Sequence, residues 1–450
     1  MAAEESSILI IGAGTFGTST AYHLSRQYKD PSLITIIDSS SSPPKPAASI
    51  DINRIIRTDY PDPLYCDLAS EAIHPWFWQL ELQAHFHKTG WIMMDEKGSD
   101  LAKRIRAVLE ERGSTQTDTI SEKVIDERWP FLKNTSKVGF GDFYWNPEAS
   151  WCDAARATAS LMAAAEKRRV RRVTAKVSKL LLDAQEAGIE GVRTVDGNVY
   201  RADKVLLAVG AWTSSLLSSI EDQLSIPSHD RIERQITATG TVSAYYRLTG
   251  AEYKRLSGAN MPMVVYGSQG EVIPPSPVSG AAYLKLNNSW TTFTNTVNTS
   301  SGHQISVPPS TQSQNDVPAG LKRETEKDLI SKLLPDVTQG KKAEFWRICW
   351  DAVSPSEDFL ICRHPHPKLK KLFVATGGSF HGYKFLPTIG RYVVNVLEGE
   401  SNGEAIDKAF AWKTGSGKGG GEGRGFGKLG LKMGAKRELR DFDQGGRANL

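Results

Sequence analysis

The chain of 450 residues has little cysteine, no long apolar run and no strong net charge. Four cysteines in a chain of this length do not make a disulfide framework, so we expect reduced thiols in an intracellular protein. No apolar run approaches the roughly 20 residues that span a bilayer, and the acidic start MAAEESS is unlike a signal peptide. These absences favour a soluble globular protein without a membrane partner.

The net charge of +4 has its origin near the C-terminus. Residues 413–450 hold nine Lys and Arg against four Asp and Glu, so the remaining chain is close to neutral. Nine glycines between positions 415 and 430 predict a solvated, Gly-rich basic tail without fixed structure as far as about Leu429. An RNA-binding tail is the alternative, but only Phe426 and Phe442 offer stacking faces, and we expect no nucleic-acid partner.

The N-terminus carries a dinucleotide-binding pattern. The apolar run SSILII precedes a glycine-rich turn and a helical pattern, and a second apolar run then ends in Asp38. Such glycines allow a tight turn and let the backbone approach a pyrophosphate closely, and the helix N-terminus favours the negative charge of the phosphates. The acid can accept hydrogen bonds from the ribose hydroxyls. An acid would repel the 2′-phosphate of NADP, which leaves NAD and FAD open. The cofactor-binding residues expected in this turn are Gly12, Gly14, Thr15, Phe16 and Gly17.

Two later segments return to the same kind of pattern. Residues 202–217 and 371–399 each read as a buried strand, a glycine turn and the start of a helix. The stretches before and between them hold strand-like runs separated by Gly, Pro and Ser turns. We therefore expect a discontinuous α/β cofactor domain interrupted twice by a β-rich α+β substrate domain. The expected ranges are 1–88, 148–220 and 344–412 for the cofactor domain, and 89–147 and 221–343 for the substrate domain.

Five blocks in the chain carry a family resemblance. They are LIIGAGTFGTSTAYHL, DINRIIRTDY, YLKL, RICWDAVSPSEDFLICRHP and GGSFHGYKFLP, in this order between residue 8 and about residue 399. The chain resembles the flavin-dependent amine oxidases that include monomeric sarcosine oxidase, L-pipecolate oxidase and L-saccharopine oxidase. The fructosyl amino acid oxidases, or amadoriases, resemble it most. The resemblance implies a Rossmann-like FAD-binding domain of the glutathione-reductase type.

The resemblance also implies how the cofactor is held. Cys349 matches the cysteine that carries FAD through a thioether at the 8α-methyl carbon, and Arg347 nearby would favour the thiolate. The alternative for a cysteine, a small buried hydrophobe, is kept for Cys66, Cys152 and Cys362. The other flavin contacts that it implies are Arg54, Val177, Gly210, Phe380, Gly382 and Lys384. No metal is expected.

The implied reaction is oxidation of the C–N bond of a secondary amine in an N-substituted α-amino acid. An imine and H₂O₂ are the products, with O₂ as acceptor. Lys285 matches the lysine that speeds the reaction with oxygen, and the alternative is an exposed strand lysine. Ser289 stands where the sarcosine oxidases place a histidine, which argues against sarcosine itself. Phe380 stands where relatives commonly have glycine, so the size of the relatives' substrates does not predict the size of the substrate of this chain.

The implied substrate site contains Arg57, Lys384 and His381. Arg57 and Lys384 would bind the substrate carboxylate, and His381 lies in the loop before the last helix. Arg54 and Arg57 are expected on one side of a helical turn or loop, and a surface ion-pair cluster with Asp51 and Asp59 is the alternative.

Two other functions share the N-terminal pattern. An NAD-linked dehydrogenase or a non-catalytic dinucleotide-binding protein would need neither Cys349 nor Lys285. We expect a monomer in the cytosol or in peroxisomes, since the final residues Ala448, Asn449 and Leu450 loosely resemble a peroxisomal signal.

Overall fold

The computed structural model describes residues 5–114, 116–183, 188–310, 313–414 and 437–443. Its first layer is a six-stranded sheet in the order β21-β22-β13-β1-β2-β9, parallel except for the edge strand β21. Both faces of its central strands are apolar and buried, as expected for a parallel sheet covered on two sides. The strands are β1 (Ile8–Ile11), β2 (Ile34–Asp38), β9 (Arg171–Thr174), β13 (Lys204–Leu207), β21 (Leu360–Arg363) and β22 (Leu372–Thr376).

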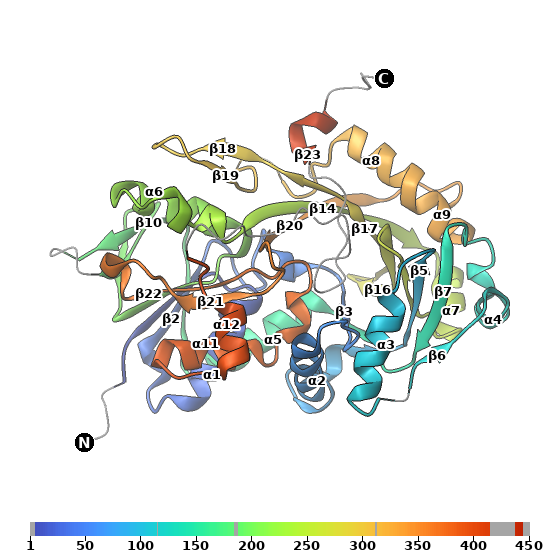
Figure 1. The fold of residues 1–450 in the computed structure, drawn as a ribbon, viewed down its shortest axis with the longest axis horizontal. Helices are drawn as coiled ribbons and strands as arrows, with labels where there is room; N and C mark the ends of the chain where they lie inside the picture. The colour runs from blue at the N-terminus through green and yellow to red at the C-terminus, as the bar shows by residue number, and fades with distance from the viewer. Residues whose placement is uncertain (1–4, 115, 184–187, 311–312, 415–436, 444–450) are drawn as a thin grey trace.

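Helices cover one face of this sheet and a small antiparallel sheet covers the other (Figure 1). Helix α1 packs between α5 and α11, and a side chain at Gly390 of α11 would lie 2.2 Å from the Ser19 carbonyl oxygen of α1. That contact requires glycine, because it brings the two backbones together. The helices are α1 (Thr15–Gln27), α5 (Ala154–Lys167), α11 (Ile389–Glu398) and α12 (Glu404–Phe410). The covering elements opposite them are β10 (Val177–Leu182), β11 (Ile189–Thr194), β12 (Val199–Arg201) and α6 (Thr213–Gln223).

The second layer is a larger sheet of nine strands among the residues described. Its order is β20-β14-β17-β16-β15-β5-β7-β6, with β23 paired to β17. The strands are β5 (Trp91–Glu96), β6 (Asp118–Thr119), β7 (Phe140–Asn146), β14 (Thr237–Leu248), β15 (Met263–Tyr266), β16 (Gly270–Val278), β17 (Ala281–Thr294), β20 (Phe345–Val353) and β23 (Arg437–Glu438).

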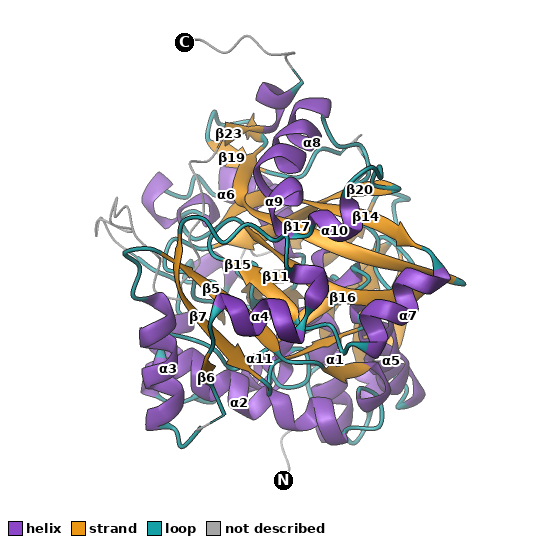
Figure 2. Cartoon of the chain, turned by 90° about the vertical axis from the view of Figure 1, so that its right-hand side faces the viewer, coloured by secondary structure: helices purple, strands orange, loops and turns teal. Residues whose placement is uncertain are grey.

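One face of the larger sheet packs on helices and forms its own apolar core. Figure 2 shows α4, α8, α9 and α10 in front of these strands. The alternating pattern of β14 is typical: Val242, Ala244 and Tyr246 point into this core, so the residues between them point to the opposite face. The remaining helices are α2 (Pro63–Trp78), α3 (Leu101–Glu111), α4 (Glu122–Arg128), α7 (Gly250–Gly258), α8 (Ala319–Thr325), α9 (Ser331–Leu333) and α10 (Pro335–Thr338).

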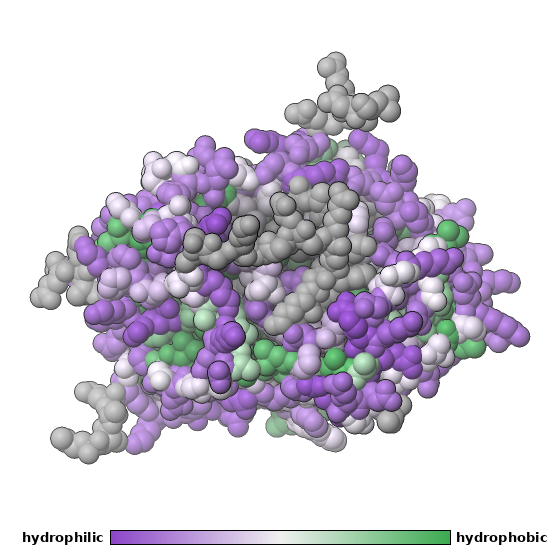
Figure 3. Space-filling model, in the orientation of Figure 1, coloured by the Kyte–Doolittle hydropathy of each residue, from purple (hydrophilic) through white to green (hydrophobic). Residues whose placement is uncertain are grey.

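Two small antiparallel sheets complete the described structure. One has the order β3-β8-β4 and the other pairs β18 with β19. Their bounds are β3 (Arg54–Ile56), β4 (Phe86–Lys88), β8 (Ser150–Cys152), β18 (Thr296–Asn298) and β19 (Gln304–Ser306). On the face seen in Figure 3 the surface is mainly hydrophilic, with apolar side chains gathered mostly across its lower half.

The expected two-part architecture is confirmed, while the domain boundaries stay a prediction. Strand β20 lies inside the range 344–412 assigned to the cofactor domain, yet it pairs with β14 of the larger sheet. The range 89–147 does contribute β5, β6 and β7 to that sheet. None of the helices in the described part of the chain is both long and apolar enough to cross a membrane.

The C-terminal segment differs in part from what the composition predicts. The glycine-rich stretch and the final tripeptide lie outside the described residues, so the tail and its targeting signal stay predictions. Arg437 and Glu438 form strand β23 beside β17, and Phe442 is buried with its ring 5.7 Å from that of Phe293. Phe442 is therefore a packing residue and offers no stacking face to a nucleic acid.

Candidate active site

A cavity of about 1520 Å³ lies between the two large sheets. It is lined by every site residue predicted from the sequence except Gly17. A side chain at Gly17 would lie 1.8 Å from the Gly12 carbonyl oxygen, so this glycine allows α1 to pack closely on the turn. The residues that line the cavity include Gly12, Gly14, Thr15, Phe16, Asp38, Arg54, Arg57, Val177, Gly210, Lys285, Cys349, Phe380, His381, Gly382 and Lys384.

The turn before α1 forms one end of the cavity. Gly12 has a φ of +98°, and a side chain there would lie 2.5 Å from the Ala208 carbonyl oxygen. At Gly14, the N-cap of α1, the nearest neighbour of an added Cβ is Ser49 Oγ at 3.8 Å. The first turn of α1 holds no acidic side chain and no side-chain cap, so its amide groups are free to bind an anion.

Asp38 ends β2 beside this turn. Its Oδ2 accepts a hydrogen bond from the Ala13 amide at 2.8 Å, and its Oδ1 accepts one from the Ser40 amide at 3.1 Å. Burial raises its pKa, which these bonds oppose. Oδ1 also accepts from Ser40 Oγ at 3.3 Å, so it is Oδ2 that keeps a second lone-pair direction for a ribose hydroxyl. Val177 of β10 and the left-handed Gly210 line the same end, and the whole arrangement fits a dinucleotide such as FAD.

Cys349 lies on the cavity face of β20. Its neighbours Trp346 and Trp350 belong to the core on the other side of the larger sheet. Arg54 donates from Nη2 to Cys349 Sγ at 3.2 Å. Arg54 is therefore the cation in contact with the thiol. Arg347, expected there from its place in the sequence, donates to the Ala47 carbonyl oxygen at 2.5 Å and interacts with Cys349 electrostatically without a hydrogen bond. Arg54 belongs to a short strand, β3, where a helical turn or loop was expected.

One buried carboxylate organises the cations of this wall. Asp51 Oδ2 lies 2.6 Å from Lys285 Nζ and 3.4 Å from Arg347 Nη1, and it also pairs with Arg54 Nη1. Tyr245 donates to Asp51 Oδ1 at 2.7 Å. Burial alone would raise the pKa of Asp51, but these three cations hold it well below its usual range. Three cations on one anion leave the cavity wall positive, which favours negative charge in the cavity.

Lys285 is only 1% exposed, which excludes an exposed strand lysine. Its pKa is lowered by burial and by Arg54, whereas Asp51 raises it. From the sequence, Asp51 was expected only as a surface partner of the arginines, and its contact with Lys285 was missed. Its position three residues before Arg54 is the sequence feature that could have indicated a buried ion pair.

Arg57 and Lys384 both lie beside the Tyr60 ring. The Arg57 guanidinium carbon is 4.5 Å from the centroid of that ring, and its buried Nη1 has no hydrogen-bond partner. Lys384 Nζ donates to Tyr60 OH at 2.7 Å and to the His381 carbonyl oxygen at 2.8 Å. Within the described ranges no carboxylate lies within 4.0 Å of either cation. Burial, and next Arg57, lower the pKa of Lys384 well below its usual value.

His381 is held behind these cations by both ring nitrogens. Its Nε2 lies 3.0 Å from the Glu357 carbonyl oxygen, so Nε2 carries the proton, and Nδ1 accepts from Tyr60 OH at 3.1 Å. Burial and Lys384 lower the pKa of His381 well below its usual value, which keeps the ring neutral. With both nitrogens bonded inside the protein, the ring orients Tyr60 and through it Lys384.

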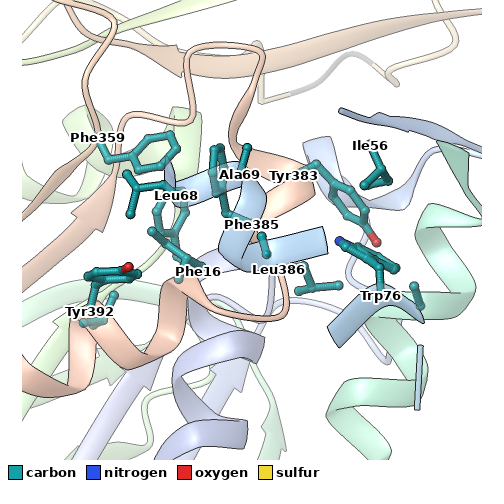
Figure 4. Packing of buried hydrophobic residues seen from close by; sticks show 14 of the residues in the cluster. Phe16, Ile56, Leu68, Ala69, Trp76, Phe359, Tyr383, Phe385, Leu386 and Tyr392 are labelled. Carbon is teal, nitrogen blue, oxygen red and sulfur yellow. The ribbon is translucent and has the colours of Figure 1, made fainter. Parts of the chain in front are cut away.

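The loop that carries these residues is fixed from two sides. Ser379 and Phe380 adopt left-handed backbone conformations, with φ of 45° and 62°, and Asp351 Oδ2 accepts from the Phe380 amide at 2.8 Å. Burial raises the pKa of Asp351 to about 6. Figure 4 shows Tyr383 and Phe385 packed near α2, where Trp76 Nε1 donates to the Lys384 carbonyl oxygen at 2.8 Å. Asp351 was also missed, although it lies inside the cysteine block.

No group of three or more His, Cys, Asp or Glu side chains in the described residues is placed to hold a metal ion.

Comparisons with known proteins agree with this geometry. The FAD dependent oxidoreductase family model matches residues 7–396. The chain is 28% identical over 426 residues to the L-saccharopine oxidase of Schizosaccharomyces pombe, covering 90% of this chain and 93% of the relative. It is 25% identical to a monomeric sarcosine oxidase of a Bacillus species, covering 85% and 90%. The solved structure of a fructosyl peptide oxidase from E. terrenum superposes with a TM-score of 0.82 at 25% identity, covering 99% and 98%. The expected relationship is confirmed, and the chain belongs to the FAD dependent oxidoreductase family.

Proposed function

We propose that this chain is a flavoprotein oxidase that converts the secondary amine of an N-substituted α-amino acid to an imine and reduces O₂ to H₂O₂. The relatives named above are oxidases of saccharopine, sarcosine and fructosyl peptides, and each name denotes a secondary amine that carries a carboxylate. The observation that carries the proposal is the pair of cations, Arg57 and Lys384, which lack a carboxylate partner in the described chain.

FAD is held by the glycine turn, the open N-terminus of α1 and Asp38 at one end of the cavity. When bound, FAD supplies a two-electron acceptor that can return electrons to O₂. The positive wall around Asp51 is where the chain stabilises negative charge without having to reorganise during the reaction. We assign Lys285 to this role, with Asp51 fixing the position of its ammonium group.

Cys349 is proposed to form a thioether with the 8α-methyl carbon of the flavin. The new C–S bond would replace the thiol S–H bond and one methyl C–H bond, and the two electrons released would pass to the flavin and then to O₂. A thiolate is the reactive form of cysteine, and the Arg54 guanidinium 3.2 Å from Sγ stabilises that form. The thiol is 7% exposed and lines the cavity, so it is shielded from solvent but open to a ligand in the cavity. Covalent attachment would prevent loss of the cofactor.

Arg57 and Lys384 are proposed to bind the substrate carboxylate. Arg57 offers a planar pair of donors, and stacking on Tyr60 fixes the plane of its guanidinium group. Lys384 has three protons, of which Tyr60 and the His381 carbonyl oxygen take two, so the third is available for the ligand. A carboxylate held by both cations places the neighbouring C–N bond at a fixed position in the cavity.

The experiment uses the purified full chain and an N-alkyl α-amino acid. The protein should be yellow, lose its colour when the amino acid is added without oxygen, and release H₂O₂ when air is admitted. NADH is the matched control, because a dehydrogenase with the same glycine turn would exchange hydride with it and would be colourless as purified. A colourless protein, or a yellow protein that no N-substituted amino acid bleaches, would contradict the proposal. A monomeric state and a peroxisomal location stay predictions.

A further inference from the structure

Glu271 lies on the cavity face of the larger sheet, on the strand next to Lys285. In the register of β16 with β17, Glu271 is opposite Asn287 and Ile273 is opposite Lys285. Side chains alternate along a strand, so Glu271 and Lys285 share one face. The intervening Val272 points instead into the apolar core on the other side. Glu271, Asn287 and Ser289 all line the cavity.

The carboxylate of Glu271 is bound only by neutral donors among the residues described. Asn287 Nδ2 donates to Oε1 at 3.1 Å, and Ser289 Oγ donates to Oε2 at 3.1 Å. In the described ranges no lysine, arginine or histidine lies within the 4.0 Å of an ion pair with it. Two carboxylate oxygens offer about four lone-pair directions, and two of these are used. The neutral donors orient the carboxylate but do not form an ion pair with it.

The charge of Glu271 nevertheless reaches the site already described. Burial is the main influence on the pKa values of Lys285 and Lys384 and lowers both, and Glu271 acts in the opposite direction on each. Glu271 therefore faces the same enclosed space as the two lysines without touching either. The cavity therefore holds two cations, Arg57 and Lys384, and one carboxylate, Glu271, none of which has an ion-pair contact among the described residues, although Asp59 and Glu271 act on Lys384 from a greater distance.

We propose that Glu271 forms a second substrate subsite that binds a primary ammonium group on the substrate's N-substituent. The inference rests on the proposed function, which places the α-carboxylate at Arg57 and Lys384. The substrate class is then an N-substituted α-amino acid whose N-substituent carries a free amine. Asn287 and Ser289 position the carboxylate, and the ammonium group supplies the missing charge.

The reacting nitrogen is a poor occupant of this subsite. A secondary amine can give up a hydride equivalent only from its neutral form, and an adjacent carboxylate would stabilise the protonated form. A cation farther along the N-substituent binds without that conflict. The subsite thus contributes to specificity and leaves the reacting nitrogen neutral.

The test compares two matched substrate series. One series is N-(ω-aminoalkyl)glycines with two to five methylenes between the nitrogens, and the other replaces the terminal ammonium by a methyl group. For the optimal chain length, the wild-type chain should prefer the ammonium substrate by about 10- to 100-fold in kcat/KM, as expected for a charge-assisted hydrogen bond. Equal values, or a preference for the alkyl series, would overturn the subsite.

Glu271→Gln should reduce that preference ratio by a similar factor, because the amide keeps the shape of the side chain and loses the charge. Glu326→Gln is the control, because this substitution removes the same charge from the chain at an exposed residue outside the cavity lining. The control should keep the wild-type ratio. A loss of the ratio in both variants, or in neither, would contradict a direct contact at Glu271.

A binding measurement separates the subsite from the reaction. Thioether analogues, in which sulfur replaces the reacting nitrogen, cannot undergo C–N oxidation and can be followed by titration calorimetry. The ammonium-bearing thioether acid should bind the wild-type chain more tightly than its alkyl partner, and Glu271→Gln should remove the difference. If this difference appears but no amine is oxidised, the proposed function fails and the subsite stands. If amines are oxidised and the difference is absent, only the subsite fails.

Discussion

Arg54 Nη2 lies 3.2 Å from Cys349 Sγ, although the two residues are 295 positions apart in the chain. Arg54 lies in β3 and Cys349 in β20, and both residues line the cavity. This contact with a guanidinium supports the proposal that Cys349, among the four cysteines, is the one that bonds to the flavin. Burial raises the pKa of Cys66, Cys152 and Cys362 and keeps those thiols protonated.

The first prediction concerns covalent attachment. Acid precipitation of the wild-type chain should leave the yellow colour in the pellet, and a proteolytic peptide containing Cys349 should carry the mass of FAD. Arg54→Gln should shift much of the colour to the supernatant because the thiolate loses its cation. Cys362→Ser is the control and should behave like the wild type. Colour wholly in the supernatant of the wild type would remove the thioether.

The second prediction concerns the reaction with oxygen. Lys285→Met should slow reoxidation of the reduced protein by roughly two to three powers of ten, as expected for loss of one preorganised charge. Lys285→Arg, which keeps the charge beside Asp51, should lose much less. Stopped-flow measurement of the two half-reactions is the readout. Equal slowing of reduction and reoxidation would show that Lys285 acts on the substrate or the fold instead.

The third prediction concerns the hydroxyl between Lys384 and His381. Tyr60→Phe should lower the free energy of unfolding by about 1–3 kcal/mol, because it leaves buried polar groups with one partner fewer. It should also raise KM for an acid substrate, since Lys384 loses a bond that positions it. Tyr266→Phe removes a hydroxyl bonded to the Ser136 carbonyl oxygen, outside the cavity lining. This control should lower stability and leave KM unchanged.

The fourth prediction concerns pH. The pKa of Lys384 is depressed, so this lysine begins to lose its proton at a lower pH than a solvent-exposed lysine. A substrate carboxylate binds the protonated form, so its contribution to binding is present below that pKa and is lost as the pH rises through it. KM for an acid substrate should therefore rise on the alkaline side. Lys384→Arg keeps its charge and should flatten this rise, whereas identical profiles would contradict the assignment.

Much of this architecture could be predicted from the sequence, for identifiable reasons. The glycine turn, Asp38 and the cysteine block are short, contiguous patterns. The first two stand at the ends of buried strands, and the cysteine block runs from within β20 through β21. Asp51 and Glu271 could not be placed in the same way. Asp51 is contacted by Tyr245 and Lys285, which lie far from it in the sequence and which the register of β14 with β17 sets opposite each other. Glu271 meets Asn287 only through the register of the β16–β17 hairpin.

The role of His381 shows the same limit. Its block identified it as a site residue, but only the folded structure shows that Tyr60 OH and the Glu357 carbonyl oxygen occupy both ring nitrogens. Arg57 is the reverse case, because its buried and unpartnered Nη1 gives the sequence prediction a physical basis.

The central claim is that Arg57 and Lys384 select a carboxylate on the substrate. The most direct measurement is kcat/KM for an N-alkyl α-amino acid and for its decarboxylated amine, in the wild type and in Arg57→Ala. Truncating one partner of a desolvated charged contact costs about 2–5 kcal/mol, so the variant should lose roughly 30- to 5,000-fold on the acid. The loss on the amine should be small. A wild-type chain that oxidises the decarboxylated amine as well as the acid would contradict the account.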